Sequence, residues 1–236
     1  MAPRNRRTST SAIRVSATCL ADFITRSGRS AESRLRPFTF NKRGEGFVRS
    51  SYYQTALKTI RAYHSQGRAP GIFDQALQEL SARALSEHDS RKRTKIEHNA
   101  ETIIAYRKLY GNRRFKVLKN RRLEFPLTGI VVTAQPDLWV EEDGFQVLLK
   151  IGVAKHHTSY IDLVLSLLRK AAIGSGLRIR ARNFVYLNVS TGREMICSGA
   201  LTRFNTTFSG AAREIASAWP KIVIEPQSPN PGEART

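Results

Sequence analysis

Cysteine is nearly absent from this chain, and so are long hydrophobic runs. Cys19 and Cys197 are the only two cysteines among 236 residues, and isolated thiols give neither a disulfide framework nor the spacing of a zinc site. No stretch reaches the roughly 18 apolar residues that a membrane span requires, and no basic amphipathic segment is bracketed by anchoring aromatic residues. We therefore expect a soluble protein without a membrane partner, located in the reducing cytoplasm.

Acidic residues are scarce as well. The chain has 19 Asp and Glu residues against 39 Lys and Arg residues, which gives a formal net charge of +20. Such an excess attracts polyanions before any specific contact forms, so nucleic acid is the expected partner. DNA is the form we expect, and association with a nucleoid is consistent with it. Since 41% of the residues are hydrophobic, the chain can also bury a sizeable core.

The two ends of the chain have compositions typical of disorder. Residues 1–15 are rich in Arg, Ser and Thr and contain no acidic residue, which predicts a disordered basic arm. The same composition is typical of a mitochondrial transit peptide, so import into an organelle remains an alternative. Residues 225–236 contain three prolines and are predicted to form a disordered tail.

Helical periodicity marks several segments between these ends. Residues 16–84 are predicted to form an N-terminal helical region, with Ser16 as a candidate helix cap and a lone His64 that we expect to be a packing residue. Residues 85–224 are predicted to form the main domain. Apolar residues recur at helical spacing in three segments of it: 87–109, 159–173 and 204–219.

The central stretch, residues 127–155, reads as a β-hairpin. Its arms at 129–140 and 145–151 are rich in β-branched, aromatic and aliphatic residues, and residues 141–144 supply turn chemistry. Because side chains alternate along a strand, Asp137 lies on one face of the first arm and Lys150 on one face of the second. If these faces coincide, the two groups meet.

Two segments combine basic and apolar residues in a way that suits phosphate contacts. Six of the ten residues at 113–122 are basic, interleaved with apolar ones, and residues 177–182 alternate apolar residues with arginines. Both segments are predicted to be strands with an outward basic face. The predicted phosphate contacts are Arg113, Arg114, Lys116, Arg121, Arg178, Arg180 and Arg182.

Pro136-Asp137, followed by Lys150 after a hairpin of fitting length, resembles the PD-(D/E)xK phosphodiesterase superfamily of restriction endonucleases and RecB-like nucleases. The resemblance covers about residues 85–200. It implies an α/β fold with an αβββαβ core, in which a mixed central sheet is flanked by helices. It also implies that Asp137 binds a divalent metal such as Mg²⁺ and that Lys150 assists the attacking water.

The sequence departs from the family pattern at several points. The family places a second carboxylate two residues before the lysine, where this chain has Leu148. The Gly-x-x-x-His and Gln-x-x-x-Tyr motifs of RecB-like enzymes are not recognisable. Glu101 is the candidate for a substitute metal ligand, and Glu97 and Glu124 are alternatives.

Three hypotheses follow from the sequence. The first is a DNA-binding protein whose nuclease-like metal site is incomplete, so that phosphodiesterase activity is weak or absent. The second is an active Mg²⁺-dependent nuclease with a migrated glutamate. The third is a basic, non-enzymatic RNA-binding or assembly protein in which Asp137 and Lys150 are only a cross-strand ion pair.

Overall fold

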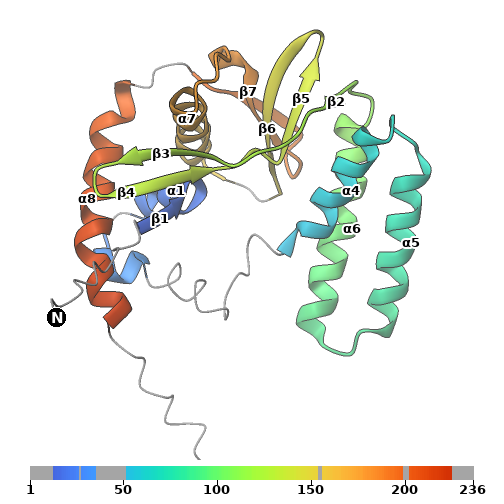
Figure 1. Ribbon diagram of the computed structural model, residues 1–236. Coiled ribbons are helices and arrows are strands. Elements are labelled where there is room, and N and C mark those ends of the chain that lie inside the picture. The colour runs from blue at the N-terminus through green and yellow to red at the C-terminus, as the bar shows by residue number, and fades with distance from the viewer. Residues whose placement is uncertain (1–12, 27, 36–51, 154–155, 199–201, 225–236) are drawn as a thin grey trace, which may run out of the picture.

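The computed structural model describes residues 13–26, 28–35, 52–153, 156–198 and 202–224 (Figure 1). Most of the predicted N-terminal arm, residues 1–12, and the whole predicted tail at 225–236 lie outside this part of the chain. The structure is α/β, as the sequence predicts, but its described strands form two mixed sheets where one central sheet was expected. None of the helices in the described ranges is both long enough and apolar enough to cross a bilayer.

The predicted helices form close to their expected positions. Ser16 caps α1, because its Oγ accepts a hydrogen bond from the backbone N–H of Cys19 at 3.1 Å. At the other end of the chain, α8 continues for one turn past Pro220, where we expected it to end, although proline cannot donate a hydrogen bond to the preceding turn. The helices are α1 (Ala17–Thr25), α4 (Gln54–Ser65), α5 (Gly71–Ser86), α6 (Ser90–Tyr110), α7 (Thr158–Gly174) and α8 (Thr202–Ile224).

The described strands form two sheets. The smaller has the order β1-β4-β3, in which β1 runs parallel to β4 and β3 antiparallel to it. The larger has the order β2-β5-β6-β7-β8, with a parallel pair at β6-β7 and antiparallel pairs elsewhere. The strands are β1 (Ile13–Ser16), β2 (Lys116–Val117), β3 (Leu123–Leu127), β4 (Ile130–Ala134), β5 (Leu138–Glu142), β6 (Phe145–Gly152), β7 (Phe184–Asn188) and β8 (Arg193–Ile196).

The first arm of the predicted hairpin is divided between these sheets. Its first half, β4, pairs with β1 and β3, and its second half, β5, pairs with β2 and β6. Gln135, Pro136 and Asp137 connect the two halves, and Pro136 has no N–H to continue a ladder. Asp137 therefore lies where the chain passes from one sheet to the other.

Two hydrophobic clusters cover the two faces of the larger sheet. On one face, Trp139, Leu148 and Tyr186 join a cluster with the smaller sheet and residues of α1, α7 and α8. On the other face, Leu138 and Leu149 join a cluster with residues of α4, α5 and α6. Figure 1 shows these two helix groups on opposite sides of the strands.

This arrangement changes the predicted domain division. The boundary expected between residues 84 and 85 falls near the end of α5, which lies against α6 in the same helical group. β1 and α1 belong with the C-terminal part, because β1 pairs with β4 and α1 contacts both α7 and α8. The predicted helical region at 16–84 is therefore not a separate unit.

The two predicted basic strands are corrected. Only Lys116 and Val117 of residues 113–122 are in a strand. Residues 177–180 form no strand, and Ala181–Asn183 is a short 3₁₀ helix.

Candidate nucleic-acid interface

Asp137 and Lys150 meet at the end of the β5-β6 hairpin. The ladder pairs Leu138 with Leu149. Asp137 immediately precedes Leu138 and Lys150 immediately follows Leu149, so the two lie opposite each other just beyond that pair. The hairpin turn fixes this register, because Asp143 and Gly144 have φ angles of 50° and 78°, as a tight two-residue turn requires. The condition that the sequence left open, that the two polar faces coincide, is met in the structure.

Both oxygens of the Asp137 carboxylate have partners. The Lys150 ammonium lies 2.9 Å from Oδ1, and the backbone N–H of Ile151 donates to Oδ2 at 2.8 Å. Each side chain of the ion pair is only 17% exposed. Charge-assisted bonds are strengthened where water is largely excluded, so this aspartate joins the two strands firmly.

Neighbouring elements hold the same backbone segment in place. Arg61 of α4 donates to the Asp137 carbonyl at 2.7 Å, and Asn120 donates from Nδ2 to the Pro136 carbonyl at 2.7 Å. Tyr186 pairs with Lys150 across the β6-β7 ladder. Burial, with smaller contributions from the charges of Tyr160 and Asp137, raises the pKa of the Tyr186 phenol, so it stays neutral.

A cavity of about 780 Å³ opens beside the ion pair, between the N-terminal strand and helix, α4, the β4-β5 connection, α7 and α8. Asp137 is the only acidic side chain among its described lining residues. Its basic lining residues are Arg14, Lys58, Arg61, Arg122 and Lys150.

These residues do not fit a magnesium site. Mg²⁺ requires near-octahedral oxygen ligands, commonly including one or two carboxylates. Among the described lining residues, Asp137 has the one carboxylate, and it is already bonded to Lys150 and Ile151. Leu148, at the position of the family's second carboxylate, is fully buried in the apolar cluster. Within the described ranges, no three His, Cys, Asp or Glu side chains gather as a metal centre would require.

The glutamates considered as substitute ligands do not complete the set. Glu101 is exposed on α6 and does not line the cavity, which corrects its prediction as a metal ligand at this site. Glu97 is also exposed on α6. Glu124 accepts a hydrogen bond from Arg14 at 2.7 Å and lies 3.4 Å from Nε of Arg122, so its charge is balanced by two arginines.

Arg113 is not available as a phosphate contact, which corrects that prediction. Its guanidinium makes two bonds to Glu142, at 2.8 and 2.6 Å, and a third to Glu194 at 2.6 Å. Burial alone would lower the pKa of Arg113, but these bonded carboxylates outweigh it and raise the pKa. The residue instead connects the end of β5 with β8.

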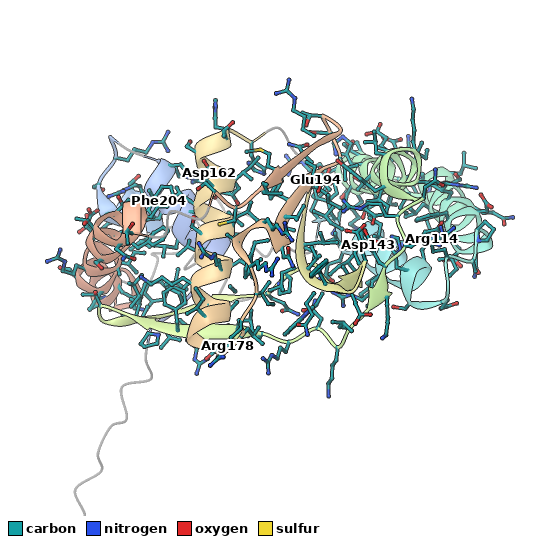
Figure 2. The ribbon with its side chains drawn as sticks, turned by 90° about the horizontal axis from the view of Figure 1, so that it is seen from above. Arg114, Asp143, Asp162, Arg178, Glu194 and Phe204 are labelled. Atoms are coloured by element: carbon teal, nitrogen blue, oxygen red, sulfur yellow. The ribbon has the colours of Figure 1, made fainter. Side chains whose placement is uncertain are left out.

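Arg114 and Lys116 are exposed, but they do not line the cavity beside Asp137. They line a shallow hollow with the hairpin turn at Asp143 and Gly144, and Figure 2 shows Arg114 next to Asp143. The Lys116 ammonium lies 3.5 Å from Glu141. Arg178, also exposed, lies well apart from Arg114 in Figure 2. The predicted phosphate contacts therefore do not form one continuous row.

The remaining predicted contacts lie against aromatic rings. Arg121 is 5.3 Å from the ring centre of Trp139, and Arg180 and Arg182 are 6.0 and 5.8 Å from that of Phe145. All three arginines are exposed, and Phe145 is 49% exposed. They remain candidates for contacts to a nucleic-acid backbone.

Sequence reasoning missed four of the five basic residues around the cavity. Arg14 comes from β1, Lys58 and Arg61 from α4, and Arg122 from the segment before β3. No local pattern connects these positions, because only the tertiary fold brings them together. The high proportion of basic residues in the sequence was the one available signal, and it does not indicate which of them converge.

Comparison with known proteins adds no family assignment. A scan against protein-family models and a search of curated proteins both gave no match to this chain.

Proposed function

We propose that this protein binds nucleic acid, most readily DNA, on a PD-(D/E)xK-like scaffold, and that it does so without a divalent metal and without cleaving the strand. The observation that carries the proposal is the Asp137-Lys150 pair, 2.9 Å apart at a cavity with a basic rim. It is the pairing that the resemblance implies, in a setting that lacks the second carboxylate.

The order of elements supports the scaffold. After α6 the chain forms the two-residue strand β2, and then β3, the β4-β5 arm, β6, α7 and β7. Apart from β2, this succession corresponds to the αβββαβ order of the family. Asp137 immediately precedes β5, Lys150 lies on β6, and α7 provides the crossover to the parallel strand β7. This correspondence supports the resemblance, although its first strand is β3 and not the basic segment at 113–122 that the sequence predicted.

The charge of the cavity supports a phosphate ligand. Five basic side chains line it, against Asp137 in the lining and Glu124 bonded to two of the arginines. That leaves an excess of three positive charges (five minus two) close to a partly enclosed space. Among the described residues, no carboxylate lies within ion-pair distance of Lys58 or Arg61, so their charges are free to meet an anion.

We infer binding without a metal because the bonds of Asp137 leave its carboxylate unsuited to bind one. With its carboxylate oxygens bonded by the Lys150 ammonium and the Ile151 N–H, Asp137 has its charge balanced without a metal ion. Phosphate binding then depends directly on Lys58, Arg61 and their neighbours. Such contacts position a strand without reading its sequence, so we expect little sequence preference.

The test is fluorescence anisotropy of a labelled DNA duplex in EDTA over a series of salt concentrations. We expect the double variant Lys58→Gln/Arg61→Gln to bind about ten-fold more weakly and to reduce the slope of log K against log salt by about 1.8, because each lost phosphate contact contributes roughly 0.9. The matched control is Arg83→Gln/Lys108→Gln, which removes two exposed charges outside the cavity. It should retain wild-type affinity within about three-fold, the long-range effect of charge.

An equal loss of DNA affinity in both double variants would show that binding depends only on net charge. A wild-type protein that does not bind DNA at low salt would refute the proposed function. Incubation of unlabelled DNA with Mg²⁺ or Mn²⁺ tests the metal-free part. Cleavage by the wild type that is lost in Asp137→Asn would replace this proposal with the migrated-ligand nuclease. Tighter binding to RNA than to DNA would favour the RNA-binding alternative.

A further inference from the structure

Phe145 is an aromatic residue that the fold leaves half open to solvent. It is the first residue of β6, next to the hairpin turn, and it is 49% exposed. Because side chains alternate along a strand, Val147 lies on the same face, where it is only 7% exposed in the cluster with α4, α5 and α6. The hydrophobic cluster on that face therefore ends before the Phe145 ring.

Two arginines flank this ring without covering it. The guanidinium carbons of Arg180 and Arg182 lie 6.0 and 5.8 Å from the ring centre of Phe145, near the outer limit of a cation–π contact at about 6 Å. By contrast, the guanidinium carbon of Arg34 lies 3.9 Å from the ring centre of Phe23, which is fully buried. A guanidinium stacked directly on a ring lies at that shorter distance, so Arg180 and Arg182 leave the Phe145 ring accessible.

The backbone holds both arginines beside the start of β6. Asn183 closes the short 3₁₀ turn that contains Arg182, because its N–H donates to the Arg180 carbonyl at 3.0 Å. The Nδ2 group of Asn183 donates to the Gln146 carbonyl of β6 at 2.9 Å. Asn183 is only 9% exposed, so both bonds are shielded from water. The turn is thus fixed before a ligand arrives, which lowers the ordering cost of binding.

The charges of the two arginines are available to an anion. Among the described residues, no carboxylate lies within ion-pair distance of either guanidinium. The acidic residues at this end of the hairpin have other basic neighbours, since Glu142 is bonded to Arg113 and Asp143 lies next to Arg114 in Figure 2. An accessible ring between cationic groups is the combination on which single-stranded nucleic acids bind, with bases on the ring and phosphates on the cations.

We propose that Phe145, Arg180 and Arg182 form a stacking site for one unpaired base of a nucleic-acid strand, with the adjoining phosphates on the two arginines. This inference rests on the proposed nucleic-acid binding and adds a contact surface outside the cavity. Bases within a duplex are stacked on one another and cannot reach the ring, so the site favours single-stranded segments and overhangs. DNA and RNA share this chemistry, and the experiment compares them.

Binding is measured by fluorescence anisotropy in EDTA with labelled oligothymidylate, the matching oligouridylate and a blunt duplex of the same length. Phe145→Leu keeps an apolar side chain but loses the ring. We expect it to bind the single strands about ten-fold more weakly, as for one lost stacked base, and the duplex within about two-fold of the wild type. Phe145→Tyr keeps the ring and should bind all three probes as the wild type does. The matched control is Leu85→Ala, which shortens an 87% exposed apolar side chain on α5 and should leave every affinity unchanged.

Phe145→Trp gives a spectroscopic readout that a merely structural role would not produce. Emission of the introduced indole should be quenched by either single strand, beyond the change seen in the wild type with its two native tryptophans, and the blunt duplex should not quench it. Arg180→Gln/Arg182→Gln should reduce the slope of log K against log salt for oligothymidylate by about 1.4, because each phosphate contact to a single strand contributes roughly 0.7. Thermal unfolding of each variant monitors its fold.

The outcomes separate this inference from the proposed function. Wild-type affinity of Phe145→Leu for both single strands, or an equal loss for single strands and duplex, would overturn the inference and leave nucleic-acid binding at the cavity intact. No binding of the wild type to any probe would overturn both. A loss confined to oligothymidylate or to oligouridylate would keep the inference and assign the site to DNA or to RNA.

Discussion

Replacing Asp137 by alanine tests whether its carboxylate is a structural connection between strands. The substitution leaves the Lys150 ammonium, 17% exposed, with only the Gln135 carbonyl at 3.4 Å. It also removes the acceptor of the Ile151 N–H, which lay 2.8 Å from Oδ2. A metal ligand whose only role was catalytic would not show these losses.

The expected cost follows from the two lost bonds. Breaking a fully buried pair costs about 3 to 5 kcal/mol, and bonds to charged groups contribute roughly 1.5 to 3 kcal/mol each. Because each partner is 17% exposed, water can reach the remaining ammonium and reduce the penalty. We expect Asp137→Ala to lower the free energy of unfolding by about 3 kcal/mol. Lys150→Met, which leaves the Ile151 bond in place, should cost about 1 to 2 kcal/mol.

The assay is urea unfolding of the wild type, both single variants and the double variant, which together form a double-mutant cycle. We expect a coupling free energy of about 1 to 2 kcal/mol between Asp137 and Lys150, since they are in direct contact. The series is run with EDTA and with Mg²⁺, and the stabilities should agree. Additive losses, or stability that rises with Mg²⁺ only when Asp137 is present, would refute this account of the site.

Three further predictions concern other parts of the fold. Burial, with smaller contributions from Arg68 and Arg113, lowers the pKa of His64 from 6.5 to about 4, so the folded state prefers neutral His64. Neutral His64 therefore contributes fully to the free energy of unfolding above pH 6.5, and this contribution falls by at most about 3 kcal/mol as the pH drops towards 4. Urea unfolding at several pH values should show this decrease in the wild type and not in His64→Gln. Arg113→Met should lower the free energy of unfolding by about 2 to 4 kcal/mol, because it leaves Glu142 without its partner, and DNA affinity should stay within about three-fold, the effect of one distant charge. Gly152→Ala should lower the free energy of unfolding by about 1 to 3 kcal/mol through overpacking, since the added Cβ would meet the Tyr186 ring. Thermal unfolding should show a lower Tm for Gly152→Ala, and the double variant Gly152→Ala/Tyr186→Leu should restore the Tm in part.

Much of the fold could be predicted because single local signals determine it. Ser16 marks the start of α1, Asp143-Gly144 marks the turn of the hairpin, and alternation in the second arm places Lys150 on the same face as Leu148. Each of these features depends on residues within one element. They made a meeting of Asp137 and Lys150 conditional on one unknown, whether the polar faces of the two arms coincide.

The features that were missed depend on contacts between distant segments. β3 was overlooked although Leu123, Phe125 and Leu127 alternate, because Pro126 opposes a strand. The strand tolerates Pro126 only because β3 is at the edge of its sheet, where one side of the backbone needs no partner. Edge position is a property of the assembled sheet and cannot be read from the residues of one strand.

The same distinction separates the basic residues that were predicted from those that line the cavity. The high density of basic residues at 113–122 led us to predict Arg113 as a phosphate contact, but its guanidinium is bonded to carboxylates of β5 and β8. The same criterion overlooked Lys58 and Arg61, which are only two of many basic residues until α4 places them beside Asp137. A cation can serve a ligand only if no carboxylate has already balanced it, and that depends on the fold. Whether the protein binds DNA through this cavity therefore depends on the basic side chains that no carboxylate balances. The drop in DNA affinity expected for Lys58→Gln/Arg61→Gln tests this dependence.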